Sequence, residues 1–532
     1  MRTTRRRLLE LGLGASALGL LDRFGFVRDR ARADASGRPT RFVTLHVPGG
    51  WVPQSLVCPL SAAEVARVIP DVGNASGEPV HFTASQVTNL DGSGDAPSEL
   101  GGLRFRMPRT WDDAALAGGM PDPRTDRRTS PNGWGWVNWR LWENACAIHG
   151  VDMGTAAHES ARVSMMCGVP GSTFRAPAMH AVIANFLAER FAETRPLASV
   201  VIGDAAVPAS VDLPSRAAPA SVATLGSLAS TLSDRPDRPW AGLRARPAAS
   251  IPAFDGSPGS LGPLGAMDAH ALTRTRRLRG TTNAATDRLY EQLHDGYRDF
   301  SALLGRDVVA ELERTVAVEH VSTPYWIPSS WGPFGVDIGG GIQSDSGVTW
   351  DDRLSLALKL LKSGVATSIS VALPGMNGFY FDTHGAGGHE RHASMQRATF
   401  EVASRFLAEL KLTPIGDGRS LLDDTVVMIT SELGRTWPRS GACDHWPANG
   451  VVLAGGCLTP NTMHGGYDLS GPDDALGFLG RPVEMLAEGG GRATAVPRTA
   501  DVCRTVYRLF GVPDAQSFIP GGSGEVVGVQ RA

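Results

Sequence analysis

The stretch ATSISVAL at residues 366–373 decides the fold class. It is a continuous run of small and β-branched residues, which is typical of a strand buried on both faces of a parallel sheet. Amphipathic helices are predicted on either side of it, at residues 351–363 and 394–412, and a second run of the same kind, DTVVMIT, follows at 424–430. Because a helix between two buried strands is the usual parallel crossover, we predict an α/β fold with a largely parallel sheet, helices on both faces and loop-rich insertions.

Shorter signals extend this pattern toward both ends of the chain. Further strands are predicted at residues 41–47, 145–149, 199–202 and 450–453, and further helices at 179–193, within 267–318 and at 500–510. Residues 203–265 are dominated by Ala, Ser, Pro and Gly, which predicts an irregular insertion rather than core structure. We therefore predict one domain over residues 34–532.

The first 33 residues have the parts of an export signal. TRRRLL at residues 4–9 places twin arginines before an apolar run that is too short and too rich in Gly and Ala to span a bilayer. A small-x-small cleavage site follows at residues 31–33. This pattern predicts export by the twin-arginine machinery to the periplasm or the medium, without a permanent membrane anchor; a basic N-terminal helix is the alternative.

The charge of the chain argues against nucleic acid as a partner. The formal net charge is -3, and residues 1–33 carry eight arginines against three acids, so the remainder is more acidic than the whole. A protein that binds nucleic acid through phosphate contacts needs the opposite balance.

The six cysteines contain no CxxC pair, which makes a zinc ribbon or a thioredoxin-type motif a poor interpretation. Cys443 with Cys457, or Cys146 with Cys167, would close short loops in an oxidising compartment. Buried free thiols are the equal alternative.

Three polar clusters follow predicted strands. Asp382 and His384 come after the strand at 366–373, Glu432 follows the strand at 424–430, and the pair Asp444 and His445 lies in the loop after that same strand. Since the carboxyl ends of parallel strands share one edge of the sheet, we expect these side chains to converge.

Carboxylates and imidazoles together form a ligand set for a divalent cation, and carboxylates crowded at one edge would repel one another without one. The predicted ligands are Asp382, His384, Glu432, Asp444 and His445. The residue types do not distinguish zinc, manganese, magnesium and calcium. The alternative is a hydrogen-bonded polar network at the rim of the sheet, with no metal.

Other polar and aromatic residues have weaker signals. His389 and His392 lie beyond a glycine-rich turn and are interpreted as supporting or surface residues. His158, in a predicted loop, is a further candidate for the same cleft. The tryptophan-rich segment at residues 132–142 could stack on a sugar, but tryptophans of this kind are more often packed.

The order of these motifs resembles domain-of-unknown-function family 1501. The resemblance rests on the twin-arginine signal, the strand with its Gly-Gly turn, DTH at 382–384, SELGR at 431–435, DHW at 444–446 and the closing helix. It implies export in bacteria and a fold similar to the alkaline phosphatase and sulfatase superfamily. By that likeness, residues 431–434 occupy the place of a Ser-Asp-His-Gly type metal motif.

One part of the pattern departs from that superfamily. Its hydrolases place a metal-binding aspartate at the end of the first strand, whereas this chain has Val52 where relatives with a GGxDGLS-like turn carry the acid. Ser55 is kept and is the candidate nucleophile, with Cys58 as a second choice.

These observations lead to two hypotheses of different classes. The first is an exported, single-metal hydrolase acting on a phosphate or sulfate ester, either a small molecule or a polymer, in which Arg435 stabilises developing negative charge. The second is a non-catalytic periplasmic or cell-surface binding protein that keeps the fold, with the tryptophan-rich segment and the insertion as its recognition surface.

Overall fold

The computed structural model describes the parts of the chain that form the body of the fold. The described residues are 37–53, 57, 87–94, 96–97, 104–108, 135–136, 139–169, 176–191, 195, 197–203, 220–222, 224–225, 228, 308–321, 348, 350–374, 381–382, 384, 388–435, 445–468, 481–482, 496–519, 524–526 and 528–531. The predicted signal at 1–33 and most of the predicted insertion at 203–265 lie outside them.

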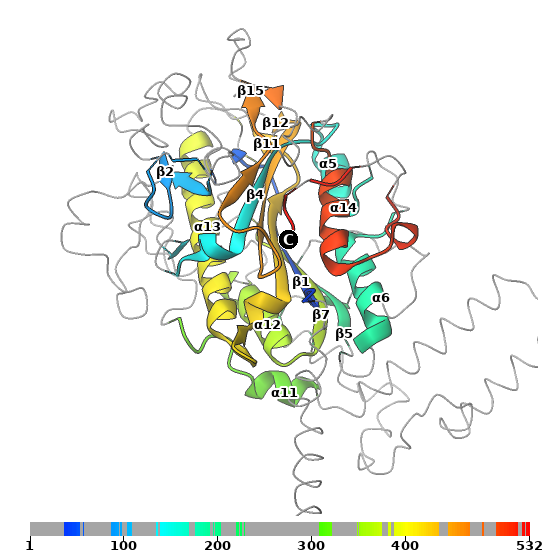
Figure 1. The fold of residues 1–532 in the computed structure, drawn as a ribbon. Helices are drawn as coiled ribbons and strands as arrows, with labels where there is room; N and C mark the ends of the chain where they lie inside the picture. Colours follow the sequence, from blue (N-terminus) through cyan, green and yellow to red (C-terminus); the bar gives the residue numbers. More distant parts are fainter. Residues whose placement is uncertain are drawn as a thin grey trace, which may run out of the picture.

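An eight-stranded sheet runs through the centre of the molecule (Figure 1). Its strands, in spatial order, are β14 (Thr462–His464), β4 (Ala145–Asp152), β13 (Ala448–Ala454), β10 (Thr425–Ser431), β1 (Arg41–Val47), β7 (Ala366–Ala372), β5 (Leu197–Ile202) and β6 (Ala220–Val222). The middle strands are buried along their whole length, as their runs of apolar, β-branched and small residues predict.

The sheet is largely parallel, which confirms the predicted fold class at this level. β10, β1, β7, β5 and β6 pair in parallel, whereas β13 pairs antiparallel with both β10 and β4. Arg41 is level with Thr425, and Val47 with Ser431, so β1 and β10 begin and end side by side. The loops after these two strands therefore leave the sheet at the same place.

Six helices are described outside the sheet. They are α5 (His158–Cys167), α6 (Met179–Phe191), α11 (Val308–Arg314), α12 (Trp350–Lys362), α13 (Gly388–Leu412) and α14 (Thr499–Phe510). The positions of α6, α12 and α14 match the predicted helices closely. α13 begins six residues earlier than predicted, so that His389 and His392 lie in its first turns.

The expectation of a loop at His158 is wrong, because this residue starts α5. The helix is short, and its apolar residues, among them Met165 and Met166, lie in its second half, so a helical period is hard to see in the sequence. Gly168, in the left-handed conformation, ends it.

Alternate residues of β1 enter two separate apolar clusters. Val43, Leu45 and Val47 pack with residues of α12 and α13, and Phe42 packs with residues of α5, α6 and α14. In Figure 1, α12 and α13 lie to the left of and below the central strands, and α5, α6 and α14 to their right. Thr44 and His46, on the same face as Phe42, are buried polar residues.

Four two-stranded sheets and three short 3₁₀ turns complete the described elements. The pairs are β2 (Val87–Asn89) with β3 (Arg106–Pro108), β8 (Pro414–Gly416) with β9 (Arg419–Ser420), β11 (Gly434–Arg435) with β12 (His445–Trp446), and β15 (Tyr467–Asp468) with β16 (Arg481–Pro482). The turns are η4 (Leu141–Asn144), η8 (Leu421–Asp424) and η9 (Asp514–Gln516).

Two tryptophans of the aromatic segment are packed, as predicted. Trp136 is fully buried between Phe105 and Phe400, its ring centroids 5.5 and 5.7 Å from theirs, and its indole N–H donates to the carbonyl of Phe400. Trp139 is also buried. The described tryptophans of this segment thus support the core rather than a sugar-stacking surface.

The structure describes four cysteines, all of them free thiols. Cys146, Cys167 and Cys503 are buried, and Cys457 is partly buried. A bridge between Cys146 and Cys167 is therefore not formed, and Cys443 lies outside the described residues. Burial raises the pKa of Cys146 and Cys503 well above the usual thiol range, which keeps both in the unreactive protonated form.

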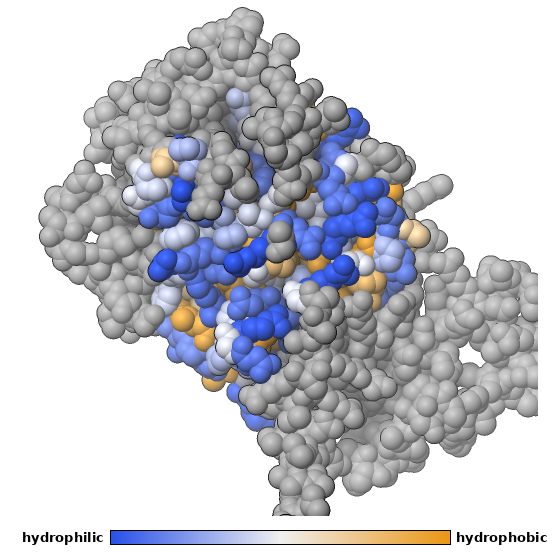
Figure 2. All heavy atoms as spheres, in the orientation of Figure 1, coloured by the Kyte–Doolittle hydropathy of each residue, from blue (hydrophilic) through white to orange (hydrophobic). Residues whose placement is uncertain are grey.

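The visible surface of the described residues is mostly hydrophilic, with small apolar patches between polar side chains (Figure 2). Among these residues, Val316 and Phe518 are the large apolar side chains that stand exposed. Within the described parts of the chain, no helix combines the length and the hydrophobicity that crossing a membrane requires.

Candidate metal centre

A glycine pair makes the close approach at the carboxyl edge of the sheet possible. Gly49 follows β1 with φ of +114°, and a Cβ there would lie 2.5 Å from the backbone nitrogen of Asp382. Gly50 has φ of +80°, and a Cβ there would meet the side chain of Leu433. Only glycine fits both conditions, so the turn after β1 can touch the segments that follow β7 and β10.

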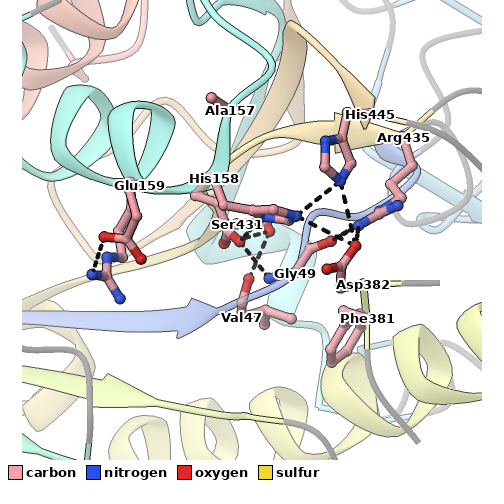
Figure 3. A network of polar contacts seen from close by, with 12 residues as sticks. Val47, Gly49, Ala157, His158, Glu159, Phe381, Asp382, Ser431, Arg435 and His445 are labelled. Atoms are coloured by element: carbon pink, nitrogen blue, oxygen red, sulfur yellow. Dashed lines mark hydrogen bonds and ion pairs between the residues drawn. The ribbon is translucent and has the colours of Figure 1, made fainter. Parts of the chain in front are cut away.

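Asp382 is the centre of the polar network at this edge (Figure 3). Its Oδ1 atom accepts from the guanidinium of Arg435 and lies within 3.3 Å of three imidazole nitrogens. Burial alone would raise the pKa of Asp382, but the contact with Arg435 outweighs burial and lowers the pKa to about 2. With its side chain 45% exposed, Asp382 is an ionised carboxylate open to solvent.

Three Nε2 atoms converge beside that oxygen. His158 Nε2 is 2.9 Å from His445 Nε2, and His384 Nε2 is 3.1 Å from the same atom. Their separations from Asp382 Oδ1 are 3.3 Å for His158, 2.9 Å for His384 and 3.3 Å for His445. His158, Asp382 and His445, from three separate segments, thus bring their ligand atoms together. His384, from the same segment as Asp382, lies against Asp382 and His445.

This convergence fits a divalent cation. Zn–N and Zn–O bonds of about 2.0–2.2 Å in a tetrahedral site imply ligand atoms about 3.3–3.5 Å apart. The measured separations are slightly shorter, so a modest outward shift of the side chains would accommodate the ion. Without a cation or a shared proton, the lone pairs of neighbouring Nε2 atoms would face each other. Asp382 Oδ1 has a second lone pair for Arg435.

The imidazoles differ in their electrostatic surroundings. The hydrogen bond between His158 and Glu432 raises the pKa of His158 above the usual range. The pKa of His445 is lowered, first by partial burial and then by the positive charge of Arg435. His445 therefore tends to be neutral, the form in which imidazole can bind a metal.

Glu432 lies behind His158 rather than beside the convergence point. It is 3% exposed, its Oε1 atom is 2.8 Å from His158 Nδ1, and it also accepts from the backbone N–H of Gly49. Burial would raise the pKa of Glu432, but hydrogen bonds from His158 and His46 hold it well below its usual range. The predicted role of Glu432 as a ligand stays a prediction.

Arg435 joins the turn after β1 to Asp382. It is fully buried and donates from Nε and Nη2 to the carbonyl oxygen of Gly49 as well as to Asp382. Its own backbone N–H donates to the carbonyl of Trp51. Its positive charge at the site is therefore fixed by the fold.

His392 ties two of the site's segments together from inside α13. Its Nε2 atom accepts from the N–H of Val52 at 3.2 Å, and its Nδ1 atom is 3.1 Å from the carbonyl of Phe381. Because Nε2 accepts, Nδ1 carries the proton and donates. This buried histidine supports the position of Asp382, the next residue after Phe381.

The structure thus brings together five predicted residues, His158, Asp382, His384, Glu432 and His445, with Arg435. Ser55, Cys58 and Asp444 and the side chain of His389 lie outside the described residues. Sequence reasoning missed His46, which faces Glu432 from β1 with Nε2 3.3 Å from Oε2. A histidine one residue before the end of a buried strand is the signal that could have found it.

Part of the chain matches a known protein family. Residues 344–477 match the model of a family described as protein of unknown function (DUF1501). The matched segment includes Asp382, His384, Glu432, Arg435 and His445, whereas His46 and His158 lie outside it. No curated protein matches the chain.

Proposed function

We propose that this chain is an exported, metal-dependent hydrolase of a phosphate or sulfate ester. The observation that carries the proposal is the convergence of His158, His384 and His445 with Asp382 at the carboxyl edge of the sheet. Ligands in open α/β sheets bind at that edge. Among the described residues, the grouping of His158, Asp382 and His445 supports metal binding.

The donor set favours a borderline transition ion. Three nitrogens and one oxygen suit zinc, manganese or iron, whereas magnesium and calcium prefer oxygen ligands throughout. When bound, such an ion would polarise the ester oxygen and lower the pKa of a water molecule. The residues themselves supply the frame, since the ligands come from three segments: the start of α5, the residues after β7, and β12.

The charges of the site favour an anionic substrate. Asp382 and Glu432 contribute two negative charges, and Arg435 with a divalent cation contributes three positive ones. The net positive charge attracts a phosphate or sulfate group. Arg435 holds Asp382 through a charge-assisted contact and adds positive charge where negative charge develops in the reaction. Ser55 remains the proposed nucleophile.

The fuller fold expectation is part of this proposal. The apolar cluster around α12 and α13 and the second cluster around α5, α6 and α14 support a sheet with helices on both faces. This layering, together with a site at the carboxyl edge, supports an arrangement similar to alkaline phosphatase and the sulfatases.

A non-catalytic binding protein is the second candidate. Val52, at the place where relatives carry an acid, is fully buried, and its N–H is bound to His392. A second metal ion would therefore lack its carboxylate from the first strand. A single ion that binds an anion without cleaving it is consistent with that difference.

The experiment compares metal content with hydrolysis. The protein is purified from an exporting host, its metals are measured by elemental analysis, and phosphate and sulfate esters are tested with zinc, manganese, magnesium and calcium. Asp382→Ala and His445→Ala should lose bound metal and hydrolysis together, while Glu159→Gln, which pairs with Arg162 away from the site, should lose neither. A folded wild type without metal would refute the proposal, and metal without hydrolysis would favour the binding protein.

Export is tested separately. Replacing Arg5 and Arg6 together by lysine should leave the protein inside the cell, because the twin-arginine machinery reads this pair. Fractionation of cells that express the wild type and the double variant measures the outcome. Equal export of both would contradict the predicted route.

A further inference from the structure

Glu432 contacts His158 at the ring nitrogen that does not face the convergence point. Its Oε1 atom is 2.8 Å from His158 Nδ1, and the other ring nitrogen, Nε2, is the one that approaches His445 and Asp382. An ionised carboxylate can only accept, so His158 Nδ1 carries the donated proton. In the neutral ring the lone pair is then on Nε2 and directed at the candidate metal position.

The fold fixes Glu432 from several sides. The backbone N–H of Gly49 donates to Oε1, and Ser431 Oγ and His46 Nε2 each lie 3.3 Å from Oε2. The hydroxyl of Ser431 donates its proton to the carbonyl of Val47 at 2.6 Å, which keeps it at the end of β1. Both carboxylate oxygens are thus engaged behind the site, in a buried position.

We propose that Glu432 is a positioning residue that sets the tautomer and orientation of His158, and that it is not itself a metal ligand. The inference rests on the proposed metal site. Carboxylates that accept from the second nitrogen of a metal-binding histidine raise the basicity of that ligand and hold its ring. His46, on the far oxygen, keeps the carboxylate pointed at His158.

The test compares the Glu432→Gln variant with the Glu159→Gln variant. Glu159 is exposed and follows His158 in the sequence, but its carboxylate pairs with Arg162 away from the site. Zn²⁺ affinity is measured by competition with a chromophoric chelator, and Co²⁺ absorption bands report the coordination number. Glu432→Gln keeps the side-chain shape, so we expect about 10–100-fold weaker Zn²⁺ binding with an unchanged coordination number. His158→Ala gives the reference spectrum for a lost ligand.

Each result supports or overturns the inference. Zn²⁺ binding by Glu432→Gln as tight as by Glu159→Gln would overturn it, and so would a Co²⁺ spectrum like that of His158→Ala, because Glu432 would then be a ligand. If thermal unfolding shows that Glu432→Gln does not fold, His46→Gln replaces it, with a smaller loss of affinity expected and no change in ligand number. A wild type that binds no Zn²⁺ overturns both this inference and the proposed metal site, whereas Zn²⁺ binding without ester hydrolysis overturns the proposed hydrolase alone.

Discussion

The two ends of the central strands β1 and β10 both carry an arginine–aspartate pair, but the two pairs meet different surroundings. At the amino ends Arg41 pairs with Asp424, and each side chain is 6% exposed. At the carboxyl ends Arg435 pairs with Asp382, whose side chain is 45% exposed. One end is closed around its charges, and the other presents its aspartate to solvent.

The partners of each aspartate explain the difference. Asp424 accepts from Thr40 at 2.6 Å as well as from Arg41, and Arg195 donates to the carbonyl of Thr40, so the hydrogen bonds of this carboxylate are made inside the protein. Asp382 has imidazole nitrogens around the oxygen that Arg435 contacts. The enclosed pair, Arg41 with Asp424, contributes to folding. The exposed pair, Arg435 with Asp382, leaves ligand atoms that a cation could bind.

The same division applies to the histidines. His149 and His180 are buried in the body of the fold and His464 is partly buried, and burial lowers their pKa values to about 3, 4 and 4. Three others converge at the open edge. Enclosed imidazoles should control stability, whereas the convergent ones should control binding.

The largest expected effect is the loss of stability in acid. Because the three enclosed histidines have lowered pKa values, the unfolded chain takes up their protons below about pH 6.5 and the folded chain does not. Stability is therefore complete above pH 6.5 and falls as the pH decreases, by roughly 2 kcal/mol per histidine at pH 5. Urea denaturation at pH 7.5 and pH 5 measures the change, and His180→Gln should show a shallower fall. An equal slope in this variant would argue against the enclosed state of His180.

Breaking the enclosed pair should come next. Asp424→Ala leaves the buried guanidinium of Arg41 without its carboxylate, which should lower the free energy of unfolding by about 3–5 kcal/mol. The matched control is Asp514→Asn, whose side chain is 54% exposed and pairs with Arg508 at the surface; its cost should be under about 1 kcal/mol. Similar costs for both variants, measured by urea denaturation, would remove the distinction between the two ends.

Removing a ligand from the open end should change binding and not folding. His384→Ala should weaken Zn²⁺ binding by at least about 100-fold, more than the loss of a supporting residue. The stability of the metal-free protein should change by less than about 0.5 kcal/mol, because the side chain is half exposed. Zn²⁺ titration and thermal unfolding provide the two readings, with His320→Ala as a control remote from the site. If His384→Ala were destabilised but bound Zn²⁺ as tightly as the wild type, His384 would be a structural residue and not a ligand.

The smallest expected effect is the difference in stability between Gly49→Ala and Gly92→Ala, which separates steric crowding from backbone strain. Gly49 and Gly92 both have positive φ, but a Cβ at Gly92 would meet nothing within 4 Å, whereas one at Gly49 would collide with the backbone of Asp382. Gly49→Ala should therefore cost about 1–3 kcal/mol more than Gly92→Ala and should also weaken Zn²⁺ binding. Equal costs in a denaturation experiment would mean that the turn tolerates the shift.

The strands that build the site could be predicted from their own residues. The runs at 366–373 and 424–430 match β7 and β10 to within one residue, because strands buried on both faces are rich in β-branched, apolar and small residues and lack charged ones in their interior. The direction of β13 could not be predicted, since the residues of a buried strand look the same in either direction. Only the pairing with β10 and β4 fixes it.

The site residues show the same limit. Asp382, His384, Glu432 and His445 could be selected because they lie next to predicted strands. His46 could be noticed as a histidine in a buried strand, but its contact with Glu432 could not be predicted, because that contact depends on the register that places His46 level with Thr430 on the neighbouring strand. A sequence gives the neighbours along the chain, and a pairing register gives the neighbours across it.

The reversed strand β13 has a consequence for how this chain can change. Arg435 leaves the site at the edge where β10 ends, and His445 enters it at the edge where β13 begins, with the two residues paired directly across β11 and β12. The two ends of the connection between them, at Arg435 and His445, therefore lie at neighbouring points. A connection between neighbouring points can change in length at little entropic cost while the residues at its base keep their positions. Replacing it by one of different length should therefore leave Arg435 and His445 side by side.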